Sequence, residues 1–302
     1  MIKSTTNLGV KGEYRIQLKN ADGIETYDSG FRPNMVLDNF FQCTLVNDAY
    51  LPANGNVTLR VGTGSTPPQP TNTSLQNLLA STTSTSATTT AFTVDGLNWK
   101  FEDTTTFRFT LGSVVGALSE LGICMDGVAN AGATTVHTRA LITDINGNPT
   151  TVTVTNQDQL LITYKLAIVG TDTDGSGTVT LDGQTYNWTT RRASGLTAGQ
   201  SLATVLSGTL NYQNAWGSGV TFGAAGIAPT GAGAVGINSA KTNPLAGRIQ
   251  HTITANIAQG NISGGILVIG GGAIHKIQFS PAIPKDATKV LSLVTEYTLS
   301  RA

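Results

Sequence analysis

The chain has 302 residues, enough for one large or two ordinary domains with a sizeable core. Only 12% of the residues are charged, and the 18 basic residues balance the 18 acidic ones. This balance argues against electrostatic binding of nucleic acid or of an anionic membrane. So little charge suits large protein–protein interfaces better than a monomer that depends on charge for solubility, so we expect an obligate oligomer.

The cysteines and the N-terminus bear on where the protein is made. Cys43 and Cys124 lie on unlike predicted elements, so we expect buried free thiols in place of a disulfide. No run approaches the ~18 apolar residues that span a bilayer. Residues 1–7 lack the apolar core of a signal peptide. We therefore expect synthesis in a cytosol without membrane insertion, with release by lysis as an alternative to retention.

The first sixty residues predict a hairpin, a short helix and a strand. Residues 14–19 alternate apolar with polar side chains, and residues 24–27 return after an Asp22-Gly23 turn. Residues 35–45 place apolar side chains near helical spacing, which predicts a short amphipathic helix. Residues 57–62 then predict a strand that ends in glycine.

A Gly-x-Gly sequence, Gly62-Thr63-Gly64, follows this strand as it does in phosphate-binding loops. Two prolines at 67 and 68 prevent a helix from opening there, and no lysine follows, so an extended connector is the better interpretation.

Two further features follow this connector. Residues 73–76 resemble a capping box, with Leu75, Leu78 and Leu79 as the buried face of one or two helical turns. The Ser/Thr-rich residues 81–90 predict an exposed loop or an edge strand.

Residues 99–169 are the part around which the chain is organised. They contain short runs rich in β-branched and aromatic residues, most of which alternate apolar with polar and are separated by Gly, Asn, Asp or Pro. The Asn146-Gly147 pair between two runs suits the positive φ angles of a type I′ hairpin. This pattern predicts an antiparallel β-sandwich.

The composition shifts to Gly, Ala, Thr and Asn over residues 170–272. We expect a hairpin that turns at Asp182-Gly183, a helical piece at 198–206, and strands at 249–257 and 262–269. The last two runs, at 273–286 and 289–299, are predicted to be strands that resemble those of the central block. The predicted fold is mainly β: an antiparallel β-sandwich with short helices, formed by 1–169 plus 273–302, with 170–272 inserted as a second β-rich lobe.

One loop has the beginning of a calcium-binding pattern. Asp172, Asp174 and Ser176 occupy loop positions 1, 3 and 5 of an EF-hand, with a glycine at position 6. Position 12, however, is Gly183 where the motif requires a bidentate Glu, and strands flank the loop instead of helices. We predict an Asx-rich turn, with Ca²⁺ as the alternative, and no other cofactor.

Four aromatic residues lie close together in the second lobe: Tyr186, Trp188, Tyr212 and Trp216. Aromatic side chains on a Gly/Asn/Thr-rich β-scaffold pack in cores and subunit interfaces, and they also stack on sugar rings. Packing is the commoner use, and a host glycan remains the alternative partner.

No residues form a recognisable catalytic set. His137, His251 and His275 lack partners at metal-ligand spacing. Glu102 and Asp103 are adjacent on a predicted strand, so their side chains point to opposite faces and do not flank one bond. The chain has no Gly-x-Ser-x-Gly nucleophile elbow. We therefore do not expect an enzyme and assign neither catalytic nor metal-binding residues.

Several runs resemble, in the same order, stretches of tailed-bacteriophage virion structural proteins. They are Val61-Gly-Thr-Gly-Ser-Thr-Pro-Pro-Gln-Pro-Thr-Asn-Thr-Ser-Leu-Gln-Asn77, Leu118-Ser-Glu-Leu-Gly-Ile123, residues 139–149, residues 158–164 and Ile277-Gln-Phe-Ser-Pro-Ala-Ile-Pro-Lys-Asp286. The likeness covers about 55–169 and 273–302, and the second lobe only loosely. It implies a β-sandwich protein of the neck or collar, the baseplate or a tail fibre.

The resemblance also implies where and with what the protein acts. We expect a homo-oligomer that contacts other virion proteins of the head–tail or tail assembly, is assembled in the host bacterial cytoplasm and leaves by lysis. Such proteins act through interfaces, so no site residues carry over. Two alternatives stay open: a receptor-binding protein that recognises host glycan through residues 170–272, and a capsid decoration protein.

Overall fold

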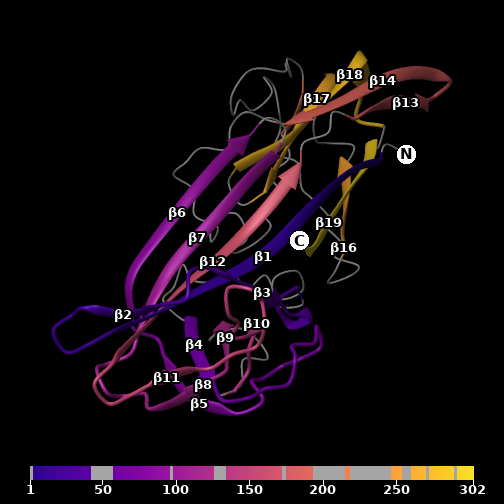
Figure 1. Cartoon of the computed structure of the whole chain (residues 1–302). Helices are drawn as coiled ribbons and strands as arrows, with labels where there is room; N and C mark the ends of the chain where they lie inside the picture. Colours follow the sequence, from indigo (N-terminus) through magenta and orange to yellow (C-terminus); the bar gives the residue numbers. More distant parts are fainter. Residues whose placement is uncertain are drawn as a thin grey trace.

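The computed structural model describes residues 3–41, 57–95, 98–125, 134–171, 175–192, 215–217, 246–253, 260–269, 272–288 and 291–302. These residues form a mainly β fold of largely antiparallel sheets, as predicted (Figure 1). The strands are β1 (Lys3–Lys19), β2 (Glu25–Asp28), β3 (Arg32–Val36), β4 (Val57–Gly62), β5 (Leu78–Thr82), β6 (Thr85–Asp95), β7 (Asn98–Arg108), β8 (Gly116–Leu118), β9 (Glu120–Met125), β10 (Thr138–Leu141), β11 (Val152–Val154), β12 (Gln159–Thr171), β13 (Gly175–Leu181), β14 (Gln184–Arg192), β15 (Ala215–Gly217), β16 (Ala246–Ile253), β17 (Gly260–Ile269), β18 (Gly272–Lys285) and β19 (Leu291–Arg301).

The long strand β1 is the centre of the larger sheet, whose order is β5-β4-β9-β10-β3-β1-β12-β7-β6. One edge of β1 pairs with β12 from Leu8 to Lys19. Its other edge pairs in turn with β19 in parallel, with β3 and with β2. Because β1 pairs with β12 on one side and with β19, β3 and β2 on the other, it joins the two halves of this sheet.

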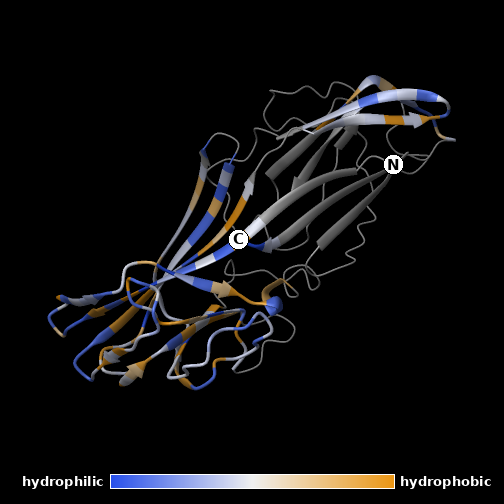
Figure 2. Ribbon diagram, turned by 45° about the vertical axis from the view of Figure 1, so that its right-hand side comes forward, coloured by the Kyte–Doolittle hydropathy of each residue, from blue (hydrophilic) through white to orange (hydrophobic). Residues whose placement is uncertain are grey.

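The larger sheet folds back on itself, and its main core lies between the two halves. Strands β7 and β12 contribute Phe101, Phe107 and Ile162 to this core, while β4 and β9 contribute Leu59 and Leu121 from the facing half. Along β7 every second residue is buried. Figure 2 shows hydrophobic and hydrophilic residues interspersed along the strands of this sheet. Each of these fully buried side chains stabilises the fold by roughly 1.5–3 kcal/mol.

A second sheet has the order β13-β14-β18-β17-β15 and lies at the far end of the long strands in Figure 1. Its small core comprises Val179, Tyr186, Ile262, Phe279 and Ile283. The two C-terminal strands divide between the sheets, because β18 pairs with β14 and β17 while β19 pairs with β1 and β16. The boundaries at 169/170 and 272/273 stay a prediction.

Two of the predicted hairpin turns differ in their backbone angles. At the β13–β14 turn both Asp182 (φ 49°) and Gly183 (φ 78°) are left-handed, as a type I′ turn requires. At the other turn only Gly147 (φ 83°) is left-handed, so the predicted type I′ turn at Asn146-Gly147 is wrong. The reason is Asp144, whose Oδ1 accepts the N–H groups of Asn146 and Asn148 at 2.8 and 2.9 Å.

The turn after β1 repeats this arrangement. Asn20 Oδ1 accepts the N–H groups of Asp22 and Ile24, as Asp144 does for the residues two and four positions later. In both turns the glycine three positions on donates its N–H to the carbonyl of the Asn or Asp. An Asx side chain that holds the loop from inside therefore fixes both turns.

Helix is scarce among the described residues. Residues 38–41 form one helical turn, Met35 and Val36 belong to β3, and the remainder of the predicted 35–45 helix lies outside the described residues. The predicted helix at 198–206 also lies outside them. No helix in the described ranges has the length and apolar character needed to cross a membrane.

The helical turns predicted around residues 73–79 are wrong. Leu75 is buried, but Leu78 and Leu79 lie in β5 and are 39% and 42% exposed. The Ser/Thr-rich run that follows contributes to β5 and forms much of β6, which is the last strand of the sheet order. The edge-strand alternative for residues 81–90 is therefore confirmed.

Candidate functional site

A buried ion pair joins β9 to β10 and organises the loop between β4 and β5. Arg139 Nη2 lies 2.8 Å from Glu120 Oε2, and Arg139 Nε donates to the same oxygen at 2.9 Å. The two side chains are 3% and 0% exposed. A pair this deeply buried loses much hydration energy, so it is tolerated only where further hydrogen bonds satisfy both groups.

Those further bonds all come from the β4–β5 loop, residues 62–77. Glu120 Oε1 accepts the N–H groups of Gly64 at 3.0 Å and Asn77 at 2.7 Å, and Oε2 accepts that of Gln76 at 3.1 Å. On the other side of the pair, Arg139 donates to the carbonyl of Thr66 and to the side chain of Asn72. The ion pair thus fixes both ends of the loop.

The Gly-x-Gly sequence is explained by the close approach of the Glu120 carboxylate. A Cβ on Gly62 would lie 2.8 Å from Glu120 Oε1, and one on Gly64 would overlap the same oxygen. The glycines therefore let the backbone approach an anion, as in a phosphate loop, but the anion is the chain's own carboxylate.

Gln76 shows why the predicted capping box does not start a helix. Its side-chain Oε1 accepts the N–H groups of Ser65 and Thr66, both at 2.8 Å, across the loop. Its own backbone N–H is bound to Glu120. Both groups that the capping box would use are therefore committed to holding the loop.

The described part of the calcium-pattern loop is strand β13 followed by the Asp182-Gly183 turn. Ser176 belongs to β13, where it pairs with Thr189. Asp172 and Asp174 lie outside the described residues. Within the described ranges, no three or more His, Cys, Asp or Glu side chains are grouped to hold a metal ion. The Ca²⁺ alternative stays a prediction.

The predicted aromatic group is described only in part. Tyr186 is 5% exposed and belongs to the small core of the second sheet, so it presents little surface to a sugar ring. Trp188 is partly buried against the same core, and its ring covers Gly177, where a Cβ would approach within 2.7 Å. Trp216 lies in β15, although its side chain is outside the description, as is all of Tyr212.

Glu102 and Asp103 point to opposite faces of β7, as predicted. Glu102 is paired with Lys100 at 2.9 Å and lies 3.8 Å from Lys165 on the outer face. Asp103 is buried on the inner face, where it accepts a hydrogen bond from Thr90. The two carboxylates therefore do not share a site.

The histidines lie on three separate strands or their approaches. His137 is fully buried just before β10, and burial, followed by the nearby Arg60 charge, lowers its pKa to about 4. His251 and His275 are in β16 and β18. A neutral, buried imidazole suits packing in the core.

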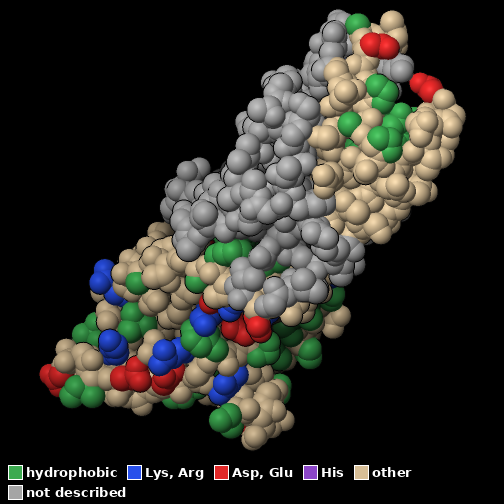
Figure 3. Space-filling model, turned by 90° about the horizontal axis from the view of Figure 1, so that it is seen from above, with side chains coloured by type: hydrophobic (Ala, Val, Ile, Leu, Met, Phe, Trp, Pro, Cys, Tyr) green, Lys and Arg blue, Asp and Glu red, His purple; other side chains and the backbone are tan. Residues whose placement is uncertain are grey.

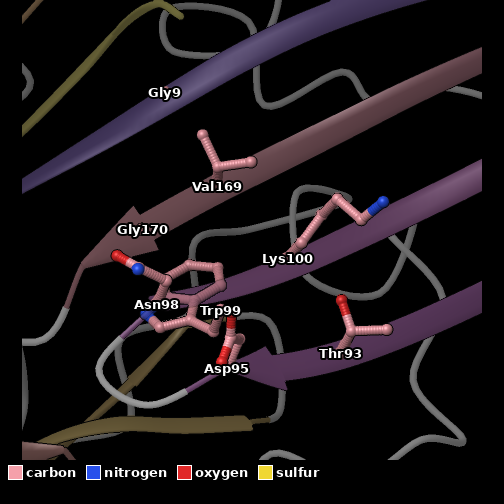
Figure 4. Close-up of a pocket in the computed structure, with 8 residues that line it drawn as sticks. All are labelled: Gly9, Thr93, Asp95, Asn98, Trp99, Lys100, Val169 and Gly170. Atoms are coloured by element: carbon pink, nitrogen blue, oxygen red, sulfur yellow. The ribbon is translucent and has the colours of Figure 1, made fainter.

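An open pocket of about 370 Å³ lies at the end of β7 near Asp95 (Figure 4). The Trp99 indole beside it is only 3% exposed, because it packs over Gly170 of the neighbouring strand. Lys100 at the rim is paired with Glu102. Asp95 is the one carboxylate among the lining residues, so the pocket does not offer a pair of carboxylates for acid–base chemistry.

Charges on the surface are mixed in sign. Figure 3 shows Lys and Arg side chains beside Asp and Glu side chains on the face that it presents. Arg15 donates from Nε to Asp28 Oδ1 at 2.8 Å, and this pair holds the pKa of Asp28 down to about 2. Such a neutralised pair presents no net charge to a charged ligand.

Comparisons with protein-family models, with curated proteins and with solved structures found no match for this chain.

The Glu120–Arg139 pair is the arrangement that sequence reasoning missed. Both residues stand at the start of apolar runs that were predicted as strands, Glu120 before Leu-Gly-Ile and Arg139 before Ala-Leu-Ile. The sequence signal for a buried pair was a single acidic residue next to one apolar run and a single basic residue next to another.

Proposed function

We propose that this protein is a structural component of a tailed-phage virion, an oligomer in the neck or tail region that acts through contacts with its own copies and with other virion proteins. The observation that carries the proposal is the meeting of three resembling runs at one buried ion pair. Glu120 lies in the run at 118–123, Arg139 begins the run at 139–149, and both bind the run at 61–77. Three of the five runs that carry the resemblance therefore form one structural unit.

This unit presents a long uncharged surface. No Asp, Glu, Lys, Arg or His occurs from Val61 to Val94. Many residues of this stretch are exposed, among them Pro67, Gln69, Leu78 and Leu79. Because the centres of protein–protein interfaces are depleted of charged residues, such a surface favours contact with another protein.

The surface is also held in place before any partner arrives. Glu120 and Arg139 fix the loop at residues 64, 66, 72, 76 and 77 through hydrogen bonds. A loop that is already ordered loses less conformational entropy on binding, so more of its contact energy contributes to affinity. This suits a permanent assembly contact.

Immunogold labelling tests the proposal and separates its alternatives. Antibodies against the purified chain would be applied to particles released from the bacteria that carry this sequence. Label at the neck, baseplate or fibres supports the proposal, and label over the whole shell would favour a decoration protein. Particles that contain no label after detergent opening would contradict a virion protein altogether.

A further inference from the structure

Strand β6 is an edge of the larger sheet as the described residues form it. It runs from Thr85 to Asp95 and pairs with β7 alone among the described strands, at the rim of the long strands in Figure 1. Residues 85–89, 91 and 93 are exposed. The ladder is regular from Ala87 to Asp95, a length of about 30 Å at ~3.4 Å per residue.

The register identifies the backbone groups that face outward. Arg108 of β7 donates its N–H to Ser84, so the even-numbered residues of β7 direct their backbone groups toward β6. Their partners, which include Ala87, Thr89 and Ala91, use their own N–H and C=O groups in that ladder. Thr88 and Thr90, between them, therefore direct theirs away from the sheet.

β6 lacks the usual protection of an edge strand. The short edge strand β2 carries Glu25 and Asp28, which bind Gln17 and Arg15 of the neighbouring strand. By contrast, β6 carries neither Lys nor Pro, and its first charge is Asp95 at the end. Natural edges are normally blocked by charge, proline or brevity, so a long neutral edge indicates a surface that is covered in the assembled protein.

We propose that the β6 edges of two copies of this chain pair antiparallel across a two-fold axis and join their sheets. We take a second copy as the occupant, because β6 carries no charge before Asp95 and can therefore face an identical strand with no like charges opposed along residues 85–94. Antiparallel pairing of a strand with itself is also self-complementary in any register, as a two-fold interface requires. Facing threonines contribute favourable cross-strand contacts. The inference rests on the proposed assembly role and names one of its interfaces.

The pairing is tested by light scattering on the full chain and on edge variants. Thr88→Pro removes an N–H that faces outward and spares the hydrogen bonds between β6 and β7. Thr88→Lys keeps that N–H and places a like charge on both copies. Thr153→Lys, an exposed threonine in β11, is the matched control. The far-UV spectrum and the thermal midpoint of each variant establish that it is folded.

The expected result is a wild-type mass of at least twice the 31.3 kDa of one chain. Both Thr88 variants should halve that mass, and the Thr153 control should not change it. Folded Thr88 variants that keep the wild-type mass, or a wild type that is monomeric at every concentration, would overturn the β6 pairing. Immunogold labelling of particles does not depend on this mass. It therefore tests the virion proposal independently of the β6 pairing.

Discussion

Glu120 and Arg139 lie on adjacent strands, and their side chains meet 2.8 Å apart in the interior while binding five residues of one loop between them. Arg139 is the register partner of Gly122, and its guanidinium binds Glu120, two residues back along β9. These hydrogen bonds hold an uncharged, proline-containing loop in one conformation. The predictions below follow from this arrangement and from the turns and buried groups around it.

Removal of one residue of the buried ion pair should lower the free energy of unfolding far more than removal of one residue of a partly exposed ion pair. Arg139→Met leaves the Glu120 carboxylate buried without its cation, which should lower the free energy of unfolding by roughly 3–5 kcal/mol. Lys100→Met, at the partly exposed pair with Glu102, should cost under about 1 kcal/mol. Urea unfolding measures both values. Equal losses would show that the buried pair does not organise the loop.

Gly64→Ala tests the close approach of the loop to Glu120. The new Cβ would overlap Glu120 Oε1 and would lie 2.5 Å from Gln76 Cβ, so the loop or the carboxylate must move. We expect a loss of about 3 kcal/mol, at the upper end for an overpacked site, measured by urea unfolding. A loss below about 1 kcal/mol would mean that the loop adapts without losing its hydrogen bonds.

In the turn between β10 and β11, substitutions of two neighbouring residues should have different effects on stability. Gly147→Ala places a side chain at φ 83°, in open space but in the left-handed region, and should cost about 1–2 kcal/mol. Asn146→Ala should cost under about 0.5 kcal/mol, because the backbone N–H of residue 146 still reaches Asp144. Thermal unfolding of both variants decides the matter. Similar losses of stability in the two variants would instead support the type I′ turn predicted from the sequence.

Acid should destabilise the protein through His137. Burial lowers the pKa of His137 from 6.5 to about 4, so the folded state favours the neutral imidazole. The resulting stability is present above pH 6.5 and is lost as the pH falls from 6.5 toward 4, by about 3 kcal/mol in all. Urea unfolding at several pH values measures this slope. In His137→Gln the slope across this range should flatten, even if the variant is less stable throughout, and an unchanged slope would assign the effect to other groups.

The strands were largely predictable because their signal is local. The alternation in β1 and β7, the apolar run of β12 and the Asp182-Gly183 turn depend on residues that are neighbours in sequence, and the structure confirms these elements. The loop from Gly62 to Asn77 was not predictable in this way. Its conformation depends on a carboxylate more than forty residues downstream, at Glu120, which takes the N–H groups that a helix cap would need.

The prediction of a type I′ turn within residues 144–148 was wrong for a related reason, although the competing residue is much closer in sequence. The Asn-Gly pair alone suits a type I′ turn, but Asp144 competes for the same N–H groups and moves the turn back by one residue. The pairing partners of β18 and β19 likewise depend on contacts between distant parts of the chain. No local pattern distinguishes a terminal strand that joins one sheet from one that joins the other.

Quantitative mass spectrometry of particles purified from the bacteria that carry this sequence tests the central claim most directly. Peptides of this chain would be counted against those of the most abundant shell protein in the same particles. The proposal predicts a fixed number of copies per particle, small beside the shell protein and unchanged by washing at high salt. Absence of these peptides from intact particles, or an amount that falls with each wash, would contradict a structural virion protein.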